Sequence, residues 1–369
     1  MGERVFSKSE YLQTREDLGI TDDNGVTAMA ELEARESGML NPIVDPAINP
    51  IRRSMIRLVA ENKHWVAKLG CPMDIEVSCD TTGSMQDEVD NQMRVLPDMY
   101  DAISKVLPGF DPQLCLGIFG DCEDDFVLCR PQFEMEAPKI VRYLNAMAPQ
   151  RCGGGNGGED PQYSMFARAY LTDAYTNNIG LKGYHFIITD EPCHYDIDER
   201  QIKRIFGENI FDKELKGMKG AIKSINGIVS DLKDKAHAFA LIVSNRYHYH
   251  SGEAYDCYRD LYGKKSVILI DSTEKLPMIL SAIIGLTEGT VEITELKERF
   301  GDDMDSELIK QLSNIEIGAQ MKLRHAMKHP VPKAGDIFAK KGDLWPIQPG
   351  ELPEDEEAEE TVADIIKYL

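Results

Sequence analysis

The stretch Met73-Asp-Ile-Glu-Val-Ser-Cys-Asp-Thr-Thr-Gly-Ser84 (MDIEVSCDTTGS) decides the fold. Its first eight residues are typical of a buried strand, and a polar turn and a long helical stretch to about Val106 follow. In open α/β sheets, ligands bind where the carboxyl ends of strands meet the amino ends of helices. This strand–turn–helix junction is therefore the place where we expect a ligand.

The rest of the chain to Gly289 continues an alternation of strands and helices. Strands are predicted at 114–120, 126–133, 183–190, 237–243 and 266–270, and helices at 137–148, 163–175, 197–235 and 275–289. The short acidic connection between the second and third strands predicts a hairpin, and therefore one antiparallel strand. We expect an α/β fold with a doubly wound, mostly parallel sheet, one antiparallel edge strand and helices on both faces.

Three parts of the chain are distinguished by pattern. Residues 1–70 are expected to be an arm ending in a helix over 50–70, where apolar residues follow one helical stripe. Residues 71–289 hold the α/β alternation. Residues 290–369 are expected to be an extension without a large core of its own, and residues 351–360 contain seven acids in ten positions.

The charge of the chain excludes some partners. Its 41 Lys and Arg against 63 Asp and Glu give a net charge of −22, which argues against binding to nucleic acid or to anionic lipid. No apolar run is long enough to span a bilayer, and the first residues do not resemble an export signal. We therefore expect a cytoplasmic protein whose eight cysteines are reduced.

Oxygen-bearing side chains gather after the first strand. Asp80, Thr82 and Ser84 alternate, so that one turn can direct a carboxylate and two hydroxyls at one point, as Mg²⁺ or Mn²⁺ requires. Two further pieces are expected at the same rim of the sheet. One is the glycine-rich run that ends in Glu159-Asp160, and the other is Asp190 at the end of a strand.

These residues resemble the von Willebrand factor A (vWA) domain with its metal-ion-dependent adhesion site. CDTTGSM matches the family signature Asp-x-Ser/Thr-Gly-Ser, FIITD matches the strand ending in Thr-Asp, and GGEDPQ resembles the intervening loop but departs from it. The resemblance covers about 71–289. It implies that Ser84 and Thr82 bind the metal directly, that Asp80 and Asp190 hold it mostly through water, and that the loop ligand is Glu159 or Asp160.

The resemblance also implies a binding module and no enzymatic activity. A carboxylate of a protein partner would complete the shell of the metal, and a MoxR-type AAA+ ATPase is one partner class that the family suggests. Self-association through the terminal arms, as a structural subunit of an assembly, is a variant of this interpretation. The alternative from another class is a metal-dependent phosphoryl hydrolase that uses Asp80.

Three other features carry hypotheses of their own. The acidic run at 120–125 is either a solvated turn or a place for a second cation. A zinc site can be drawn from Cys193, His194, His248, His250 and Cys257, although their spacings match no regular zinc module. A carboxylate of the acidic segment at 351–360 could occupy the open position of the metal.

Overall fold

The computed structural model describes the chain in several stretches. The described residues are 6–18, 52–54, 58–61, 64–67, 71–123, 127–131, 133–135, 137–145, 147, 157–244, 250–326 and 337–338. The acidic segment at 351–360, residues 153–156 of the glycine-rich run and His248 lie outside them. In the part that is described, no helix is both long and apolar enough to cross a membrane.

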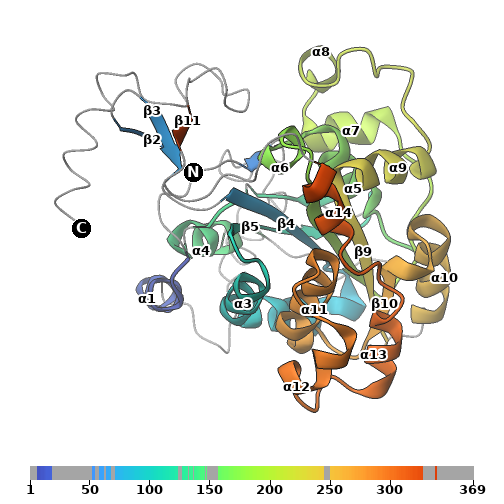
Figure 1. The fold of residues 1–369 in the computed structure, drawn as a ribbon. Helices are drawn as coiled ribbons and strands as arrows, with labels where there is room; N and C mark the ends of the chain where they lie inside the picture. Colours follow the sequence, from blue (N-terminus) through green and yellow to red (C-terminus); the bar gives the residue numbers. More distant parts are fainter. Residues whose placement is uncertain are drawn as a thin grey trace.

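A six-stranded sheet forms the centre of the molecule (Figure 1). Its strands are β4 (Cys71–Asp80), β5 (Phe110–Phe119), β6 (Leu128–Cys129), β8 (Gly183–Thr189), β9 (Ala236–Val243) and β10 (Val267–Ile270). They lie in the order β10-β9-β8-β4-β5-β6, and only β6 at the edge is antiparallel. The predicted fold class is confirmed: the sheet is Rossmann-like, with the doubly wound order 3-2-1-4-5-6 when its strands are numbered along the chain.

Helices cover both faces of this sheet (Figure 1). The described helices are α1 (Lys8–Asp17), α3 (Gln86–Val106), α4 (Ala137–Asn145), α5 (Gln162–Tyr170), α6 (Tyr175–Asn178), α7 (Glu199–Phe206), α8 (Ile210–Lys213), α9 (Ile225–Lys235), α10 (Ser251–Tyr262), α11 (Leu276–Glu288), α12 (Leu296–Phe300), α13 (Ser306–Leu312) and α14 (Ala319–Ala326). Successive residues of a strand point to opposite faces, so each strand supplies two cores. In β9, Phe239 and Leu241 join the core beneath α3 and α11, whereas Ala240 and Ile242 join the core beneath α5, α9 and α10.

Strand β4 is buried on both faces although one of them is polar. Its odd positions, such as Ile75 and Val77, are apolar, and its even positions Asp74 and Glu76 carry acids that are fully buried. Arg168 pairs with Asp74, and Arg130 pairs with Glu76, with Nε 2.6 Å from Oε1. Buried charges need such partners. The alternation in MDIEVSCD therefore reflects a buried ion-pair layer.

The segment 50–70 is the main departure from the sequence prediction. A helix was expected there, but the structure has β1 (Arg52–Ser54), β2 (Leu58–Glu61) and β3 (His64–Ala67). Strand β1 pairs with β7 (Thr172–Ala174), and β2-β3-β11 form a second sheet, where β11 is Ile337–Phe338. Short apolar runs are compatible with either structure, and here strand partners far along the chain decide.

Two predicted helices are also shorter than expected. The helix predicted over 163–175 ends at Tyr170, because residues 172–174 pair with β1. The one predicted over 197–235 is divided into α7, α8 and α9. Gly207, which follows α7, has a φ of 103°, a backbone conformation that a helix does not continue.

Residues on both sides of the α/β alternation pack onto its core. Tyr11 of α1 is fully buried, and its hydroxyl donates to the Met93 carbonyl of α3 at 3.2 Å. Phe6 stacks on Tyr100, with ring centroids 4.5 Å apart. After Gly289, the apolar side chains that join the core beneath α11 are Val291, Leu296, Met304, Leu308, Leu312 and Ile315.

Candidate metal centre

The candidate site lies between the carboxyl ends of β4 and β8, which are neighbours in the sheet. From β4 the chain passes through α3 to β5 on one side, and from β8 it passes to β9 on the other. The strand order reverses between them, and this is where doubly wound folds form a ligand-binding crevice. Asp80 ends β4, and Asp190 directly follows β8.

Hydrogen bonds from both strand ends hold Asp80. Its Oδ1 accepts from the Thr82 backbone N–H at 2.9 Å and from the Thr82 hydroxyl at 2.7 Å, and its Oδ2 accepts from the Thr189 hydroxyl at 2.7 Å. The carboxylate is fully buried. Burial, and after it the negative charge of Asp190, raise the pKa of Asp80 to about 7. A cation at this point would stabilise both carboxylates.

Ser84 links the turn after β4 to the end of β8. Its hydroxyl donates to Asp190 Oδ1 at 2.9 Å. Ser84 itself is exposed, whereas Asp190 is 1% exposed, so the pair extends from the core to the surface. Direct hydrogen bonds thus join Asp80 to Thr82 and Ser84 to Asp190, and the two pairs lie at neighbouring strand ends. All of these groups offer oxygen, the donor that Mg²⁺ and Mn²⁺ prefer.

The two acids that end the glycine-rich run, Glu159 and Asp160, make different contacts. Glu159 is buried, and its backbone pairs with the segment after Asp190: its N–H donates to the Pro192 carbonyl at 2.9 Å, and its carbonyl accepts from the His194 N–H at 2.9 Å. This backbone pairing places Glu159 beside the segment that follows Asp190.

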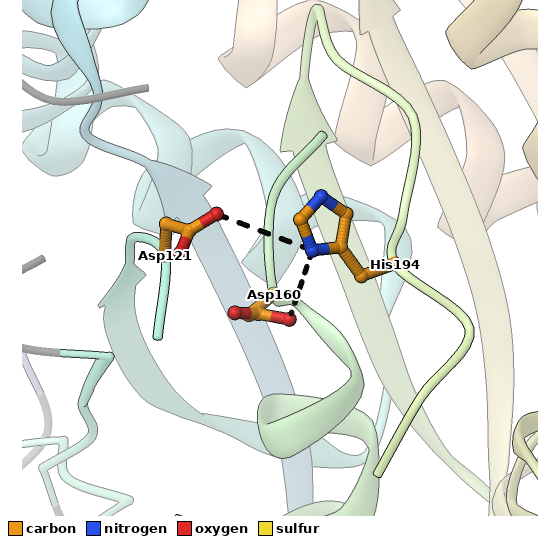
Figure 2. Close-up of side chains that lie close together, drawn as sticks. All are labelled: Asp121, Asp160 and His194. Atoms are coloured by element: carbon orange, nitrogen blue, oxygen red, sulfur yellow. Dashed lines mark ion pairs between the residues drawn. The ribbon is translucent and has the colours of Figure 1, made fainter. Parts of the chain in front are cut away.

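Asp160 belongs to a different group of side chains. Its Oδ2 accepts from the Cys122 backbone N–H at 2.6 Å, and its Oδ1 accepts from the Gln162 amide. The same Oδ1 lies 3.7 Å from His194 Nδ1, and Asp121 Oδ2 lies 4.0 Å from that nitrogen. Figure 2 shows the two carboxylates, which come from separate segments, directed at the same nitrogen of the imidazole ring. Asp121, Asp160 and His194 form a second group that could hold a metal ion.

The sequence indicates the members of this second group only separately and not as one site. The acidic run at 120–125 suggested a second cation, and His194 was considered as part of a zinc site with cysteines. In the structure, the Cys193 N–H donates to Cys257 Sγ at 3.3 Å inside the core, while His194 faces the two aspartates. Burial raises the pKa of Cys193 well above its usual value, so its thiol is a neutral part of the core.

Comparisons with known proteins find only weak similarities. No model of a protein family and no curated protein matches the sequence. Among solved structures, the chain is similar to proximal thread matrix protein 1 from the mussel byssus (TM-score 0.34, 16% identity), with 60% of this chain and 47% of that chain covered. It is also similar to the pilus adhesin SpaC from Lactobacillus rhamnosus GG in its open conformation (TM-score 0.36, 12% identity), with 63% and 34% covered. The chain therefore matches less than half the length of either protein.

Proposed function

We propose that Asp80, Thr82, Ser84 and Asp190 bind Mg²⁺, or Mn²⁺ in its place, and that the ion captures a carboxylate of a protein partner. The observation that carries the proposal is the Ser84–Asp190 hydrogen bond, which joins the oxygen ligands of two neighbouring strand ends into one group. The resemblance of CDTTGSM and FIITD to the vWA family supports the same ligand set. Glu159 is the loop residue that we expect to join it.

The proposal gives each ligand a role. Thr82 and Ser84 would offer neutral hydroxyl oxygens to the ion, so the site would keep part of the positive charge of the metal uncompensated. The carboxylates of Asp80 and Asp190 would hold the ion mostly through water. An exchangeable position at the exposed side, near Ser84, would then attract an acidic side chain of the partner.

The contacts of Asp80 favour binding over phosphoryl transfer. Both of its oxygens accept hydrogen bonds, from Thr82 and from Thr189, as suits a carboxylate that positions other ligands. A nucleophilic carboxylate needs one oxygen directed at its substrate. The role that follows from this proposal is that of an adaptor or an assembly component, for which a MoxR-type AAA+ ATPase is one partner class.

The proposal is tested first with the metal alone. Titration calorimetry of the full chain, stripped with EDTA, should show one Mg²⁺ site, and electron paramagnetic resonance should show Mn²⁺ displaced by Mg²⁺. Ser84→Ala should weaken the binding of both Mg²⁺ and Mn²⁺. Ser104→Ala is the matched control, because that hydroxyl lies on α3 and donates to the Tyr100 carbonyl of its own helix.

A second arm tests the partner. Proteins retained by the immobilised wild type in Mg²⁺ but not in EDTA are purified, and their acidic residues are substituted one at a time. Loss of capture on replacement of a single partner carboxylate supports the proposal. Capture that persists in EDTA and in Ser84→Ala would show that binding does not pass through the metal.

A further inference from the structure

We infer that Asp121, Asp160 and His194 form a second metal site, separate from the Asp80 group, that is selective for a divalent transition-metal ion such as Zn²⁺. None of the three residues belongs to the ligand set proposed for Mg²⁺. The inference therefore stands or falls independently of the proposed function.

Backbone hydrogen bonds hold three segments together at this site. Asp121 follows β5, Asp160 precedes α5, and His194 follows β8. The Asp160 N–H donates to the Gly120 carbonyl at 3.2 Å, and the His194 N–H donates to the Glu159 carbonyl at 2.9 Å. The three side chains are therefore positioned by fixed main chain, as a preorganised ligand set requires.

The spacing of the ligand atoms fits a shared ion better than it fits direct hydrogen bonds. One ligand atom from each residue can be chosen so that all lie within 4.8 Å of one another. His194 Nδ1 is 3.7 Å from Asp160 Oδ1 and 4.0 Å from Asp121 Oδ2, which is beyond hydrogen-bond length. Two ligands of a zinc ion, with bonds of about 2.0–2.2 Å, lie roughly 3–3.5 Å apart. A small contraction would thus close the site around an ion.

The burial of the two carboxylates and the types of ligand atom indicate which kind of ion fits this site. Asp121 and Asp160 are 1% and 3% exposed, so their charges are held close together with little water around them. An imidazole nitrogen with two carboxylates suits Zn²⁺ and other transition ions better than Mg²⁺, which prefers oxygen alone. The His194 side chain is 31% exposed, so solvent reaches the ion and can fill the remaining positions.

Gly158 makes room for the imidazole. A Cβ at this position would lie 2.6 Å from His194 Nε2 and 3.0 Å from the Pro192 carbonyl oxygen. Any side chain at 158 would therefore displace the ring from the two aspartates. Gly158→Ala thus disturbs the site without removing a ligand.

The rival explanation is a metal-free ionic contact between a protonated His194 and the two aspartates. It predicts no zinc binding at this place, whereas the metal site predicts binding that requires a neutral imidazole. Metal titration therefore separates the two.

The experiment is a calorimetric titration of the EDTA-stripped full chain with ZnCl₂ in saturating Mg²⁺, repeated with Co²⁺ to record its visible spectrum. We expect one ion per chain and a Co²⁺ spectrum without the near-ultraviolet band of thiolate ligation. His194→Gln should weaken Zn²⁺ binding by more than the roughly 10–100-fold that the loss of a supporting residue costs, and Gly158→Ala should weaken it within that range. His250→Gln, a histidine beside Glu253 on an exposed helix start, is the control and should bind as the wild type does.

Two results would overturn the inference. One is a wild type that binds no Zn²⁺ under these conditions. The other is binding with equal affinity in wild type and His194→Gln, with thermal unfolding showing that both are folded. Failure of the Mg²⁺ titration with retention of the Zn²⁺ site would reject the proposed function and leave this inference standing.

Discussion

The Ser84 hydroxyl donates a hydrogen bond to Asp190 Oδ1 across 2.9 Å, although the two residues are 106 positions apart. The bond spans the boundary between β4 and β8, where the strand order reverses. Asp80 is fully buried, and its pKa is raised to about 7 by burial and by the charge of Asp190. The site thus concentrates negative charge, which destabilises the metal-free protein and favours a bound cation.

Asp80→Asn is expected to separate stability from metal binding. The amide oxygen can accept from Thr82, and the amide nitrogen can donate to the Thr189 hydroxyl, which can turn toward the Glu191 carbonyl 3.4 Å away. Without the buried charge, the metal-free variant should be more stable than the wild type by up to about 4 kcal/mol at pH 8, since the pKa of Asp80 is raised from 3.8 to about 7 and one pKa unit corresponds to roughly 1.4 kcal/mol. Urea unfolding in EDTA measures this difference.

The same variant should lose its response to Mg²⁺. The wild type should gain about 2.7 kcal/mol at a Mg²⁺ concentration 100 times the dissociation constant, and Asp80→Asn should gain little. Asp98→Asn, on the exposed side of α3, is the control for the loss of one acid. A metal-free Asp80→Asn protein that is less stable than the wild type would mean that the carboxylate is structural.

The buried pair Glu76–Arg130 is expected to act as a unit. Both side chains are fully buried, and Arg130 Nη2 also donates to the Thr172 hydroxyl at 2.8 Å. Burial alone would raise the pKa of Glu76, but the charge and hydrogen bonds of Arg130 lower it. Arg130→Met should cost about 3–5 kcal/mol, because it leaves Glu76 buried without its partner.

The double variant Glu76→Leu/Arg130→Met should recover much of that loss, since replacing both charges with apolar groups is often neutral. Guanidinium unfolding of the two variants and of Glu76→Leu completes the double-mutant cycle. Additive losses across the cycle would contradict the proposed coupling of the pair.

A fully buried histidine, His185, and a half-buried one, His237, predict how stability depends on acid. Burial lowers the pKa of His185 and of His237 to about 4, whereas an unfolded histidine titrates near 6.5. Between these values the unfolded chain binds protons that the folded chain does not. The contribution of these two histidines to the free energy of unfolding is therefore at its full value above about pH 6.5 and is lost as the pH is lowered toward 4.

Each histidine can contribute a slope of up to roughly 1.4 kcal/mol per pH unit in this window. His237→Gln should reduce the slope of unfolding free energy against pH between 6.5 and 4.5, as measured by urea unfolding. His325→Gln, which removes a histidine of α14 that is exposed, should leave the slope unchanged. Equal slopes in wild type and His237→Gln would show that His237 is also protonated in the folded state.

Much of the fold could be predicted from the sequence, because its signals are local. In the strands at 71–80, 183–189 and 236–243, nearly all of the described side chains are buried. The turn DTTGS marks the end of the first strand. The proximity of Asp80 to Asp190 could be expected as well, since parallel strands bring their carboxyl ends to one edge.

What could not be predicted depends on distant partners. Segment 50–70 forms strands because β7 and β11 pair with them, and no local pattern reveals those partners. Asp121, Asp160 and His194 share no regular spacing, so only the packing of three connecting segments brings them together. Asp160 was grouped with Glu159 by proximity in sequence, but its carboxylate lies with His194.

A matched pair of glycines tests how tightly α11 packs. Gly252, in the first turn of α10, and Gly285, within α11, are both helical, and alanine is favoured over glycine in helices by up to about 1 kcal/mol. A Cβ at Gly252 would meet no atom within 4 Å. Gly252→Ala should therefore raise the free energy of unfolding by about 0.5–1 kcal/mol.

Gly285→Ala should have the opposite sign. A Cβ there would overlap Val291 Cγ2, would lie 3.0 Å from the Val291 Cβ, and would lie 3.4 Å from the Val106 Cβ at the end of α3. Val291 is held in place because the Val291 N–H donates to the Gly285 carbonyl at 3.2 Å, so it cannot simply move away. Overpacking of this kind costs about 1–3 kcal/mol, which exceeds the gain in helix propensity. Urea unfolding of both variants at pH 7.5 should place them on opposite sides of the wild type. If Gly285→Ala were also stabilised, the chain after Gly289 would have to yield at Val291, and its attachment to α11 would be looser than the structure shows.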